Sequence, residues 1–285
     1  MLPSVRPWSL LLTAVGTTVV LTAVSLWLRV RILEPESADF FGQSPPTGFA
    51  VAYRLFNTDG ERNVPTWFSA VLLVTIALVS FGVSTVLRDR GLPLRWYWLG
   101  LAAVFTFLSL DELAGLHEEL IPRMSLVVEA RGAFRFPWIV VGAPVVAVFA
   151  LVYARFLWKL PRRTAGLLLV AGALYVVGAL GLEAFGGQFH PEDRELTLPY
   201  VLTTSVEELL EMLGAALCLY AVADHARALV QLPLAVADGD SAPEARDGTS
   251  ADEGHSDEEP AGQGADGGRN TANGSVTDSS GVTNR

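Results

Sequence analysis

Long apolar runs alternate with polar connections over the first 231 residues of the chain. Each run holds about 20 residues, which is the length that an α-helix needs to cross the hydrocarbon core of a bilayer. The pattern therefore predicts an all-α integral membrane protein that contains a bundle of six transmembrane helices. The expected spans are residues 8–29, 65–87, 95–116, 137–158, 164–185 and 198–223.

The first run has the features of a helix that stays in the protein. It follows Arg6 and ends at Trp27 and Arg29, residue types that are common where a helix leaves the membrane. A cleaved signal peptide would have a shorter apolar core followed by a small-residue cleavage site. We therefore expect residues 8–29 to act as an uncleaved signal anchor.

Basic residues in the connections predict the orientation, because short cytoplasmic loops carry an excess of Lys and Arg. Such residues cluster after the second and the fourth expected span, at Arg88, Arg90, Arg95, Arg155, Lys159, Arg162 and Arg163. If both clusters face the cytoplasm, strict alternation of the spans places both chain termini there as well. We therefore expect a multi-pass plasma-membrane protein whose connections at 30–64, 120–136 and 186–197 lie outside the cell.

Composition separates a C-terminal tail from this membrane domain. The chain is 51% hydrophobic and has a formal net charge of −10, but residues 232–285 hold 11 acids and three arginines and so account for −8 of that charge. This segment has no apolar periodicity with which to bury a core. We expect a membrane domain at residues 1–231, followed by a disordered acidic cytoplasmic tail. The bilayer is the expected partner, and the lack of excess basic charge argues against nucleic acid.

Several kinds of site are excluded by simple counts. The single cysteine, Cys218, allows neither an intrachain disulfide nor a cysteine-based zinc site. No metalloprotease, nucleophile-elbow or phosphate-loop motif occurs in the chain. Two of the four histidines, His225 and His255, lie on the expected cytoplasmic side. A three-histidine zinc site that faces outward therefore cannot be built.

The third and sixth expected spans contain acidic residues, which are costly in a bilayer, at about 2.5–3.5 kcal/mol for Asp at a helix midpoint. In the expected orientation these acids lie near the outer surface. Helical periodicity puts the acids of each span within an arc of about 120°, so each span has one acidic face that should avoid lipid. The candidate site residues are Asp111, Glu112, His117, Glu118, Glu207, Glu208 and Glu211, with Glu61, Glu183 and His190 as secondary candidates.

The chemistry of these candidates leaves alternatives open. An oxygen-rich site with at most two imidazoles suits a divalent metal such as Mg, Mn, Ca or Fe, and carboxylates alone suit a small cation or protons. His117 points away from Glu118 unless the helix breaks at Gly115. Interpretations without a functional site are that Glu118 lies beyond the membrane, or that the acids form ion pairs with buried arginines such as Arg123 or Arg135.

Two classes of function remain. The first is a membrane protein with an outward-facing metal or cation site, for which the sequence does not decide whether a reaction is catalysed. The second is a cation- or proton-coupled transporter that uses the same acids as a relay. A non-catalytic membrane sensor or assembly protein is a third alternative.

Four motifs carry a resemblance to known sequences. They are Glu61-Arg-Asn-Val-Pro-Thr-Trp67, Phe107-Leu-Ser-Leu-Asp-Glu112, His117-Glu118 and Glu207-Glu-Leu-Leu-Glu-Met-Leu-Gly214. With these motifs the chain resembles a group of uncharacterised prokaryotic multi-pass membrane proteins. The resemblance covers about the first 225 residues. It implies no activity for the chain.

The expected orientation can be tested by cysteine labelling. In a Cys218→Ala background, a cysteine placed at Ser44 should react with a membrane-impermeant maleimide on intact cells, because that connection is expected outside. A cysteine placed at Ser241 should react only after the cells are opened. Labelling of position 241 on intact cells, or of position 44 only after opening, would contradict the orientation.

Overall fold

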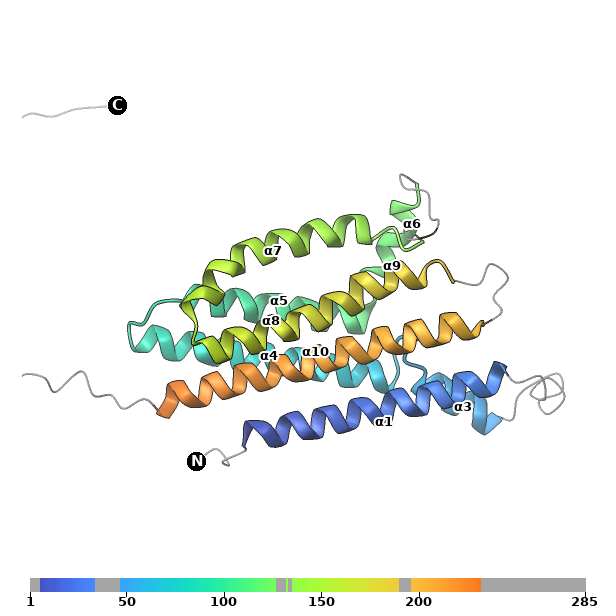
Figure 1. Ribbon diagram of the computed structural model, residues 1–285, viewed down its shortest axis with the longest axis horizontal. Helices are drawn as coiled ribbons and strands as arrows, with labels where there is room; N and C mark the ends of the chain where they lie inside the picture. Colours follow the sequence, from blue (N-terminus) through green and yellow to red (C-terminus); the bar gives the residue numbers. More distant parts are fainter. Residues whose placement is uncertain (1–5, 34–46, 127–131, 133–134, 190–195, 232–285) are drawn as a thin grey trace, which may run out of the picture. The chain divides into compact units, whose positions relative to one another are not determined.

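The computed structural model describes residues 6–33, 47–126, 132, 135–189 and 196–231, and all regular elements in these ranges are helical (Figure 1). The all-α prediction is confirmed for this part of the chain. Two predictions lie outside the described residues, namely the candidate ligand His190 and the tail at 232–285.

Five helices are long and apolar enough to cross a membrane by length and composition. They are α1 (Pro7–Leu33), α4 (Val64–Asp89), α5 (Arg95–Ala114), α7 (Ile139–Lys159), and the continuous helix formed by α8 (Arg162–Val176), η3 (Val177–Leu182) and α9 (Glu183–Gly186). α10 (Leu198–Gln231) is longer than any of these, at 34 residues, but three glutamates interrupt its apolar sequence and it is not among the five. Short helices α3 (Thr47–Phe56), η1 (Glu118–Leu120) and α6 (Ile121–Met124) lie in the connections.

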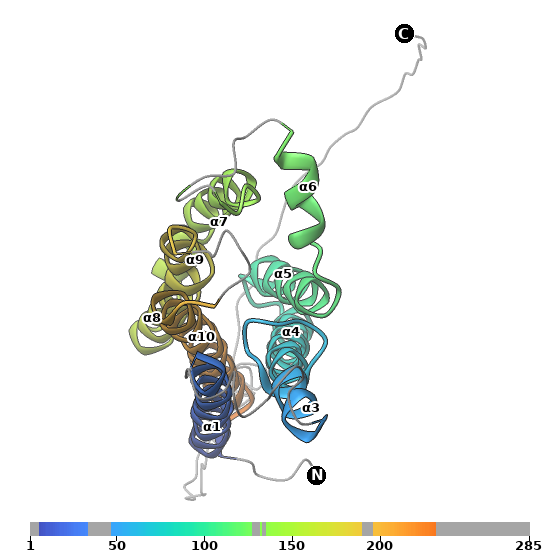
Figure 2. The ribbon, with the colours of Figure 1, turned by 90° about the vertical axis from the view of Figure 1, so that its right-hand side faces the viewer.

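α10 packs against three of the other long helices. It contacts α1, α4, α8, η3 and α9, and the most extensive contact in the bundle joins α4 to α5. Figure 2, which looks nearly along the helix axes, shows α10 between α1 and α8 with α4 beside it. The outside of the bundle carries exposed apolar side chains, among them Leu151 and Trp158 of α7.

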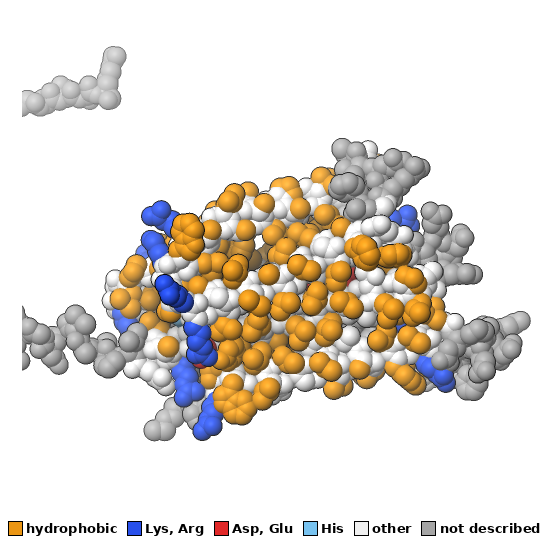
Figure 3. All heavy atoms as spheres, in the orientation of Figure 1, with side chains coloured by type: hydrophobic (Ala, Val, Ile, Leu, Met, Phe, Trp, Pro, Cys, Tyr) orange, Lys and Arg blue, Asp and Glu red, His pale blue; other side chains and the backbone are white. Residues whose placement is uncertain are grey.

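Charged and apolar side chains are separated along the helices. Figure 3 shows hydrophobic side chains over the middle of the visible face, whereas Lys and Arg side chains gather mainly at the end where α7 meets α8. An apolar middle flanked by basic residues is typical of a helix bundle in a bilayer. The five apolar helices and this distribution are compatible with a membrane protein.

Aromatic side chains join α5, α7 and α10 at the basic end of the bundle. Trp98 of α5 is fully buried and its ring lies edge-on to Phe156 of α7, with the two centroids 5.4 Å apart. On its other side Trp98 stacks on His225 of α10 at 4.8 Å. The hydroxyl of Tyr153 in α7 donates a hydrogen bond to the backbone oxygen of Tyr97 in α5, at 3.0 Å. These contacts hold the three helices together at this end, which leaves the opposite end free to widen.

Two glycines let the α8–η3 segment touch α10 backbone to backbone. A methyl group on Gly214 of α10 would lie 2.8 Å from the backbone nitrogen of Tyr175 and 2.9 Å from the carbonyl oxygen of Ala171. A methyl group on Gly178 of η3 would lie 2.9 Å from the carbonyl oxygen of Glu207. Small residues at helix contacts permit this close approach in membrane bundles. The spacing between α8 and α10 therefore depends on these two positions.

Alanine substitution should measure this dependence. Gly214→Ala should lower the free energy of unfolding by about 1–3 kcal/mol, because the new methyl group has to push two helix backbones apart. Gly172→Ala is the matched control, since a methyl group there meets nothing within 4 Å. It should leave stability unchanged or raise it by up to about 1 kcal/mol through helix propensity. Thermal unfolding in detergent gives the comparison, and equal melting temperatures for the two variants would contradict the close packing.

Candidate functional site

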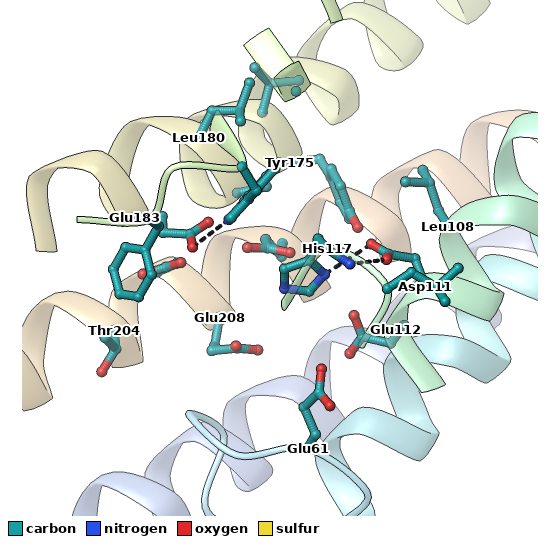
Figure 4. A pocket seen from close by; sticks show the side chains of 18 of the residues that line it. Glu61, Leu108, Asp111, Glu112, His117, Tyr175, Leu180, Glu183, Thr204 and Glu208 are labelled. Carbon is teal, nitrogen blue, oxygen red and sulfur yellow. Dashed lines mark hydrogen bonds and ion pairs between the residues drawn. The ribbon is translucent and has the colours of Figure 1, made fainter. Parts of the chain in front are cut away.

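A cavity of about 700 Å³ lies between α5, α7, the α8–η3–α9 helix and α10 (Figure 4). We call it the acid cavity because eight acidic residues line it. They are Asp59, Glu61, Asp111, Glu112, Glu183, Glu207, Glu208 and Glu211. His117 lines it as well. The structure thus brings to one cavity all the predicted site residues except Glu118, whose side chain is not described, and His190.

These side chains come from separate parts of the chain. Asp59 and Glu61 lie in the connection before α4, where Asn63 caps the helix by accepting a hydrogen bond from the backbone of Thr66 at 3.1 Å. The last turn of α5 and the first residue of α9 contribute further acids. The three glutamates of α10 fall within about one helical turn, or roughly 6 Å along the axis. Figure 4 shows Glu61, Glu112 and Glu208 pointing toward the same space.

A helix break at Gly115 turns His117 back onto Asp111. Gly115 follows the last residue of α5 and has a φ of 61°, a left-handed conformation that favours glycine. The backbone N–H of His117 donates to one carboxylate oxygen of Asp111 at 2.9 Å, and its Nδ1 lies 3.0 Å from the other. A continuous helix would have turned the imidazole away. The predicted helix end at residue 116 therefore comes two residues too late, and the break explains the position of His117.

The position of the Glu61 side chain also depends on Gly115. A methyl group at Gly115 would lie 2.5 and 2.6 Å from the two carboxylate oxygens of Glu61. The glycine therefore serves two purposes, because it reverses the chain and leaves room for a carboxylate from another part of the sequence.

Two further acids of the cavity have identified partners. Glu183 accepts a hydrogen bond from the indole nitrogen of Trp138 at 2.8 Å. Asp59 accepts one from Nη2 of Arg29 at 3.0 Å and one from the hydroxyl of Tyr200 at 3.2 Å. The sequence analysis placed Arg29 at the membrane surface, whereas its side chain is fully buried. Its Nε and Nη1 make no hydrogen bond within the described residues.

Residues around Arg29 were missed by the sequence analysis. Asp59 lies in a turn-rich segment, and only the buried position of Arg29 could have suggested that an acid must accompany it. Tyr53 of α3 lies near both charges, and burial raises the pKa of its phenol, while the smaller effects of Arg29 and Asp59 oppose each other. Arg123, which the sequence offered as a partner for the acids, is exposed and makes no ion pair within the described residues.

Four carboxylates of the acid cavity make no hydrogen bond or ion pair with any described residue. They are Glu112, Glu207, Glu208 and Glu211. Glu208 and Glu211 are half-buried and line the cavity. Ionised carboxylates that share a space of low dielectric repel one another. Such a group is stable only if it shares protons or takes up a cation.

A compact metal centre is not preformed. No group of three or more His, Cys, Asp or Glu side chains within the described ranges lies close enough together to hold a metal ion. The divalent metal site that the sequence suggests therefore stays a prediction. The acids are spread along the walls of the cavity.

The described part of the chain is thus a helical protein with five helices of membrane-spanning length and an acid-lined cavity. The chain belongs to a family described as a domain of unknown function (DUF8692), which matches residues 12–225. This match agrees with the resemblance to an uncharacterised family, although it bears on neither the four motifs nor a prokaryotic origin. Neither a curated protein nor a solved structure matches the chain significantly.

The ion pair of Arg29 and Asp59 can be tested by substitution. Asp59→Asn should lower the free energy of unfolding by about 3–5 kcal/mol, because it leaves the buried charge of Arg29 without a counter-ion. Asp89→Asn removes the exposed partner of Arg88 and should cost at most about 1 kcal/mol.

Thermal unfolding of both variants in detergent gives the comparison. Adding Arg29→Met to Asp59→Asn should restore most of the lost stability, because the double variant no longer buries an unpaired charge. Equal effects of Asp59→Asn and Asp89→Asn would show that the buried pair is unimportant.

Proposed function

We propose that the chain is a multi-pass plasma-membrane protein that binds a cation in the acid cavity, near the extracytoplasmic side of the membrane. The observation that carries this proposal is the set of four carboxylates, Glu112, Glu207, Glu208 and Glu211, that line one cavity of about 700 Å³ and make no hydrogen bond or ion pair with any described residue. A buried negative charge without a counter-ion is unstable, so the cavity suits a ligand of opposite charge. Whether the bound cation takes part in a reaction is a separate question.

In this proposal α10 is the sixth span. Its 34 residues measure about 51 Å along the axis, more than the roughly 30 Å of the hydrocarbon core. The basic connections between α4 and α5 and between α7 and α8 lie at one end of the bundle. The cavity lies at the other end of the bundle, because its residue Thr66 belongs to the first turn of α4 and its residue Asp111 to the last turn of α5. Both termini are then cytoplasmic and the cavity faces outward.

Cation- or proton-coupled transport by the same acids is the second candidate. It is favoured by the buried hydroxyl groups of Thr18 and Thr22 in α1 and Ser80 in α4, which find no hydrogen-bond partner among the residues that the structure describes. A separate space of about 10 Å³, near the size of one water molecule, lies against Glu112 and Glu211. Polar atoms of this kind are places where water enters a bundle. Uptake of the bound cation into sealed vesicles separates transport from binding.

The binding proposal predicts stabilisation by a cation. At a hundredfold excess over its dissociation constant, a cation that binds only the folded protein adds about 2.7 kcal/mol of stability, which should raise the melting temperature by about 5–10 °C. Purified protein in detergent should be screened with monovalent metals, the four divalent metals named above and organic ammonium ions. Glu208→Gln and Glu211→Gln should abolish the rise.

Glu119→Gln is the control, because this side chain is exposed and does not line the cavity. It should respond to the cation as the wild type does. If no cation changes the melting temperature of the wild type, the cation-binding proposal fails. Stability that rises on mild acidification would then favour shared protons, since the crowded carboxylates would be relieved as they become protonated.

A further inference from the structure

The acid cavity is larger than a metal ion needs. Metal ions bind oxygen ligands at about 2.0–2.6 Å, so a metal centre requires several ligands that converge on one point. The described residues contain no such group, and the cavity volume of about 700 Å³ lies within the range of organic-ligand sites. Size and ligand spacing therefore both favour a molecule over a bare ion.

Aromatic rings stand beside the acids. Trp138, Tyr175 and Tyr200 line the cavity together with the glutamates. The ring of Trp138 is fixed by its hydrogen bond to Glu183 and by contact with His117, whose ring centroid lies 5.3 Å away. Gly142 makes room for this ring, since a methyl group there would lie 2.5 Å from Trp138 Cζ3. Fixed aromatic faces next to carboxylates are the surroundings that ammonium groups prefer.

The part of the cavity wall that α7 forms is apolar. Val141, Val145 and Val146 of α7 line it, and Leu108 and Leu180 belong to the neighbouring helices. Glu208 and Glu211, which have no hydrogen-bond or ion-pair partner among the described residues, lie on α10. The cavity therefore combines carboxylates on α10 with an apolar surface along α7, which fits a ligand with a charged head and an apolar body.

We infer that the acid cavity binds an organic ammonium cation whose charged head lies at Glu208 and Glu211 and whose apolar body lies along α7. This inference rests on the cation-binding function proposed above. The ammonium group can come from a water-soluble amine or from a lipid headgroup, because α7 also presents apolar side chains on the outside of the bundle.

The test uses the full chain in a maltoside detergent with benzyltrimethylammonium as the probe. Binding is followed by tryptophan fluorescence and by melting temperature. Benzyltrimethylammonium should bind and stabilise the protein, whereas the uncharged benzyl alcohol should not. Glu208→Gln and Trp138→Leu should each weaken binding about tenfold or more, because one removes the counter-charge and the other the aromatic face. Glu119→Gln should bind as the wild type does.

A second pair of variants tests the apolar wall without touching the acids. Val146→Trp fills the space beside α7 and should weaken the binding of benzyltrimethylammonium about tenfold or more. The binding of tetramethylammonium, which lacks the apolar body, should be weakened less. Val148→Trp is the matched control, since Val148 is exposed on the same helix and does not line the cavity. If Val146→Trp and Val148→Trp bind benzyltrimethylammonium with equal affinity, the assignment of the apolar body to α7 is overturned.

The failures of the two proposals are distinguishable. If a metal ion stabilises the wild type, Glu208→Gln removes that effect and benzyltrimethylammonium does nothing, the ammonium inference is overturned and the cation-binding function stands. If neither kind of cation binds, both are overturned. Equal binding of benzyl alcohol would show that charge is not recognised and would also overturn the inference.

Lipid discs identify the source of the ammonium group. If a headgroup supplies it, discs that contain phosphatidylethanolamine should raise the melting temperature above that in pure phosphatidylglycerol, and Glu208→Gln should remove the difference. If a soluble amine supplies it, both discs should give the same melting temperature and the same gain from benzyltrimethylammonium. Both results support an ammonium site, and neither requires a metal.

Discussion

Carboxylates inside a helix bundle must be kept away from lipid, and the arrangement of the long helices can be understood from this requirement. α10 carries three glutamates in its first half, and the α8–η3 segment approaches it closely at Gly178 and at Gly214 of α10 itself. Close packing on that side leaves the glutamates facing inward, toward α5 and α7. The acids of α5 and of the connection before α4 meet them there. The cavity is thus the space at which several acidic segments meet on the inside of the helix bundle.

The two ends of the bundle serve different purposes. At the basic end, rings from α5, α7 and α10 are stacked and fill the space between the helices. At the other end the same helices separate around the acid cavity. A rigid contact at one end and an open space at the other gives a site whose walls are held by packing some distance away. Binding residues are most precisely placed when they stand on such rigid elements.

The long helices and the acids within them could be predicted, because long apolar runs, and the charged residues that interrupt them, are visible without knowledge of the fold. The sequence could not show that Gly115 ends α5, since an isolated glycine is tolerated within many helices. It therefore could not place His117 against Asp111. The places of Asp59 and Trp138 in the cavity could not be predicted for another reason. Their roles depend on contacts with Arg29 and Glu183, which are 30 and 45 residues away in the sequence.

The π-helical turn of η3, at Val177–Leu182, has a consequence for how this family can vary. A π-helical turn holds one more residue than an α-helical turn, so it rotates everything that follows it relative to what precedes it. Glu183 comes directly after this turn and faces the acid cavity. Loss or gain of a single codon there would change which side chain enters the cavity while both flanking helices stay apolar. The chemistry of the cavity can therefore change in one genetic step while the apolar character of the helices on either side is kept.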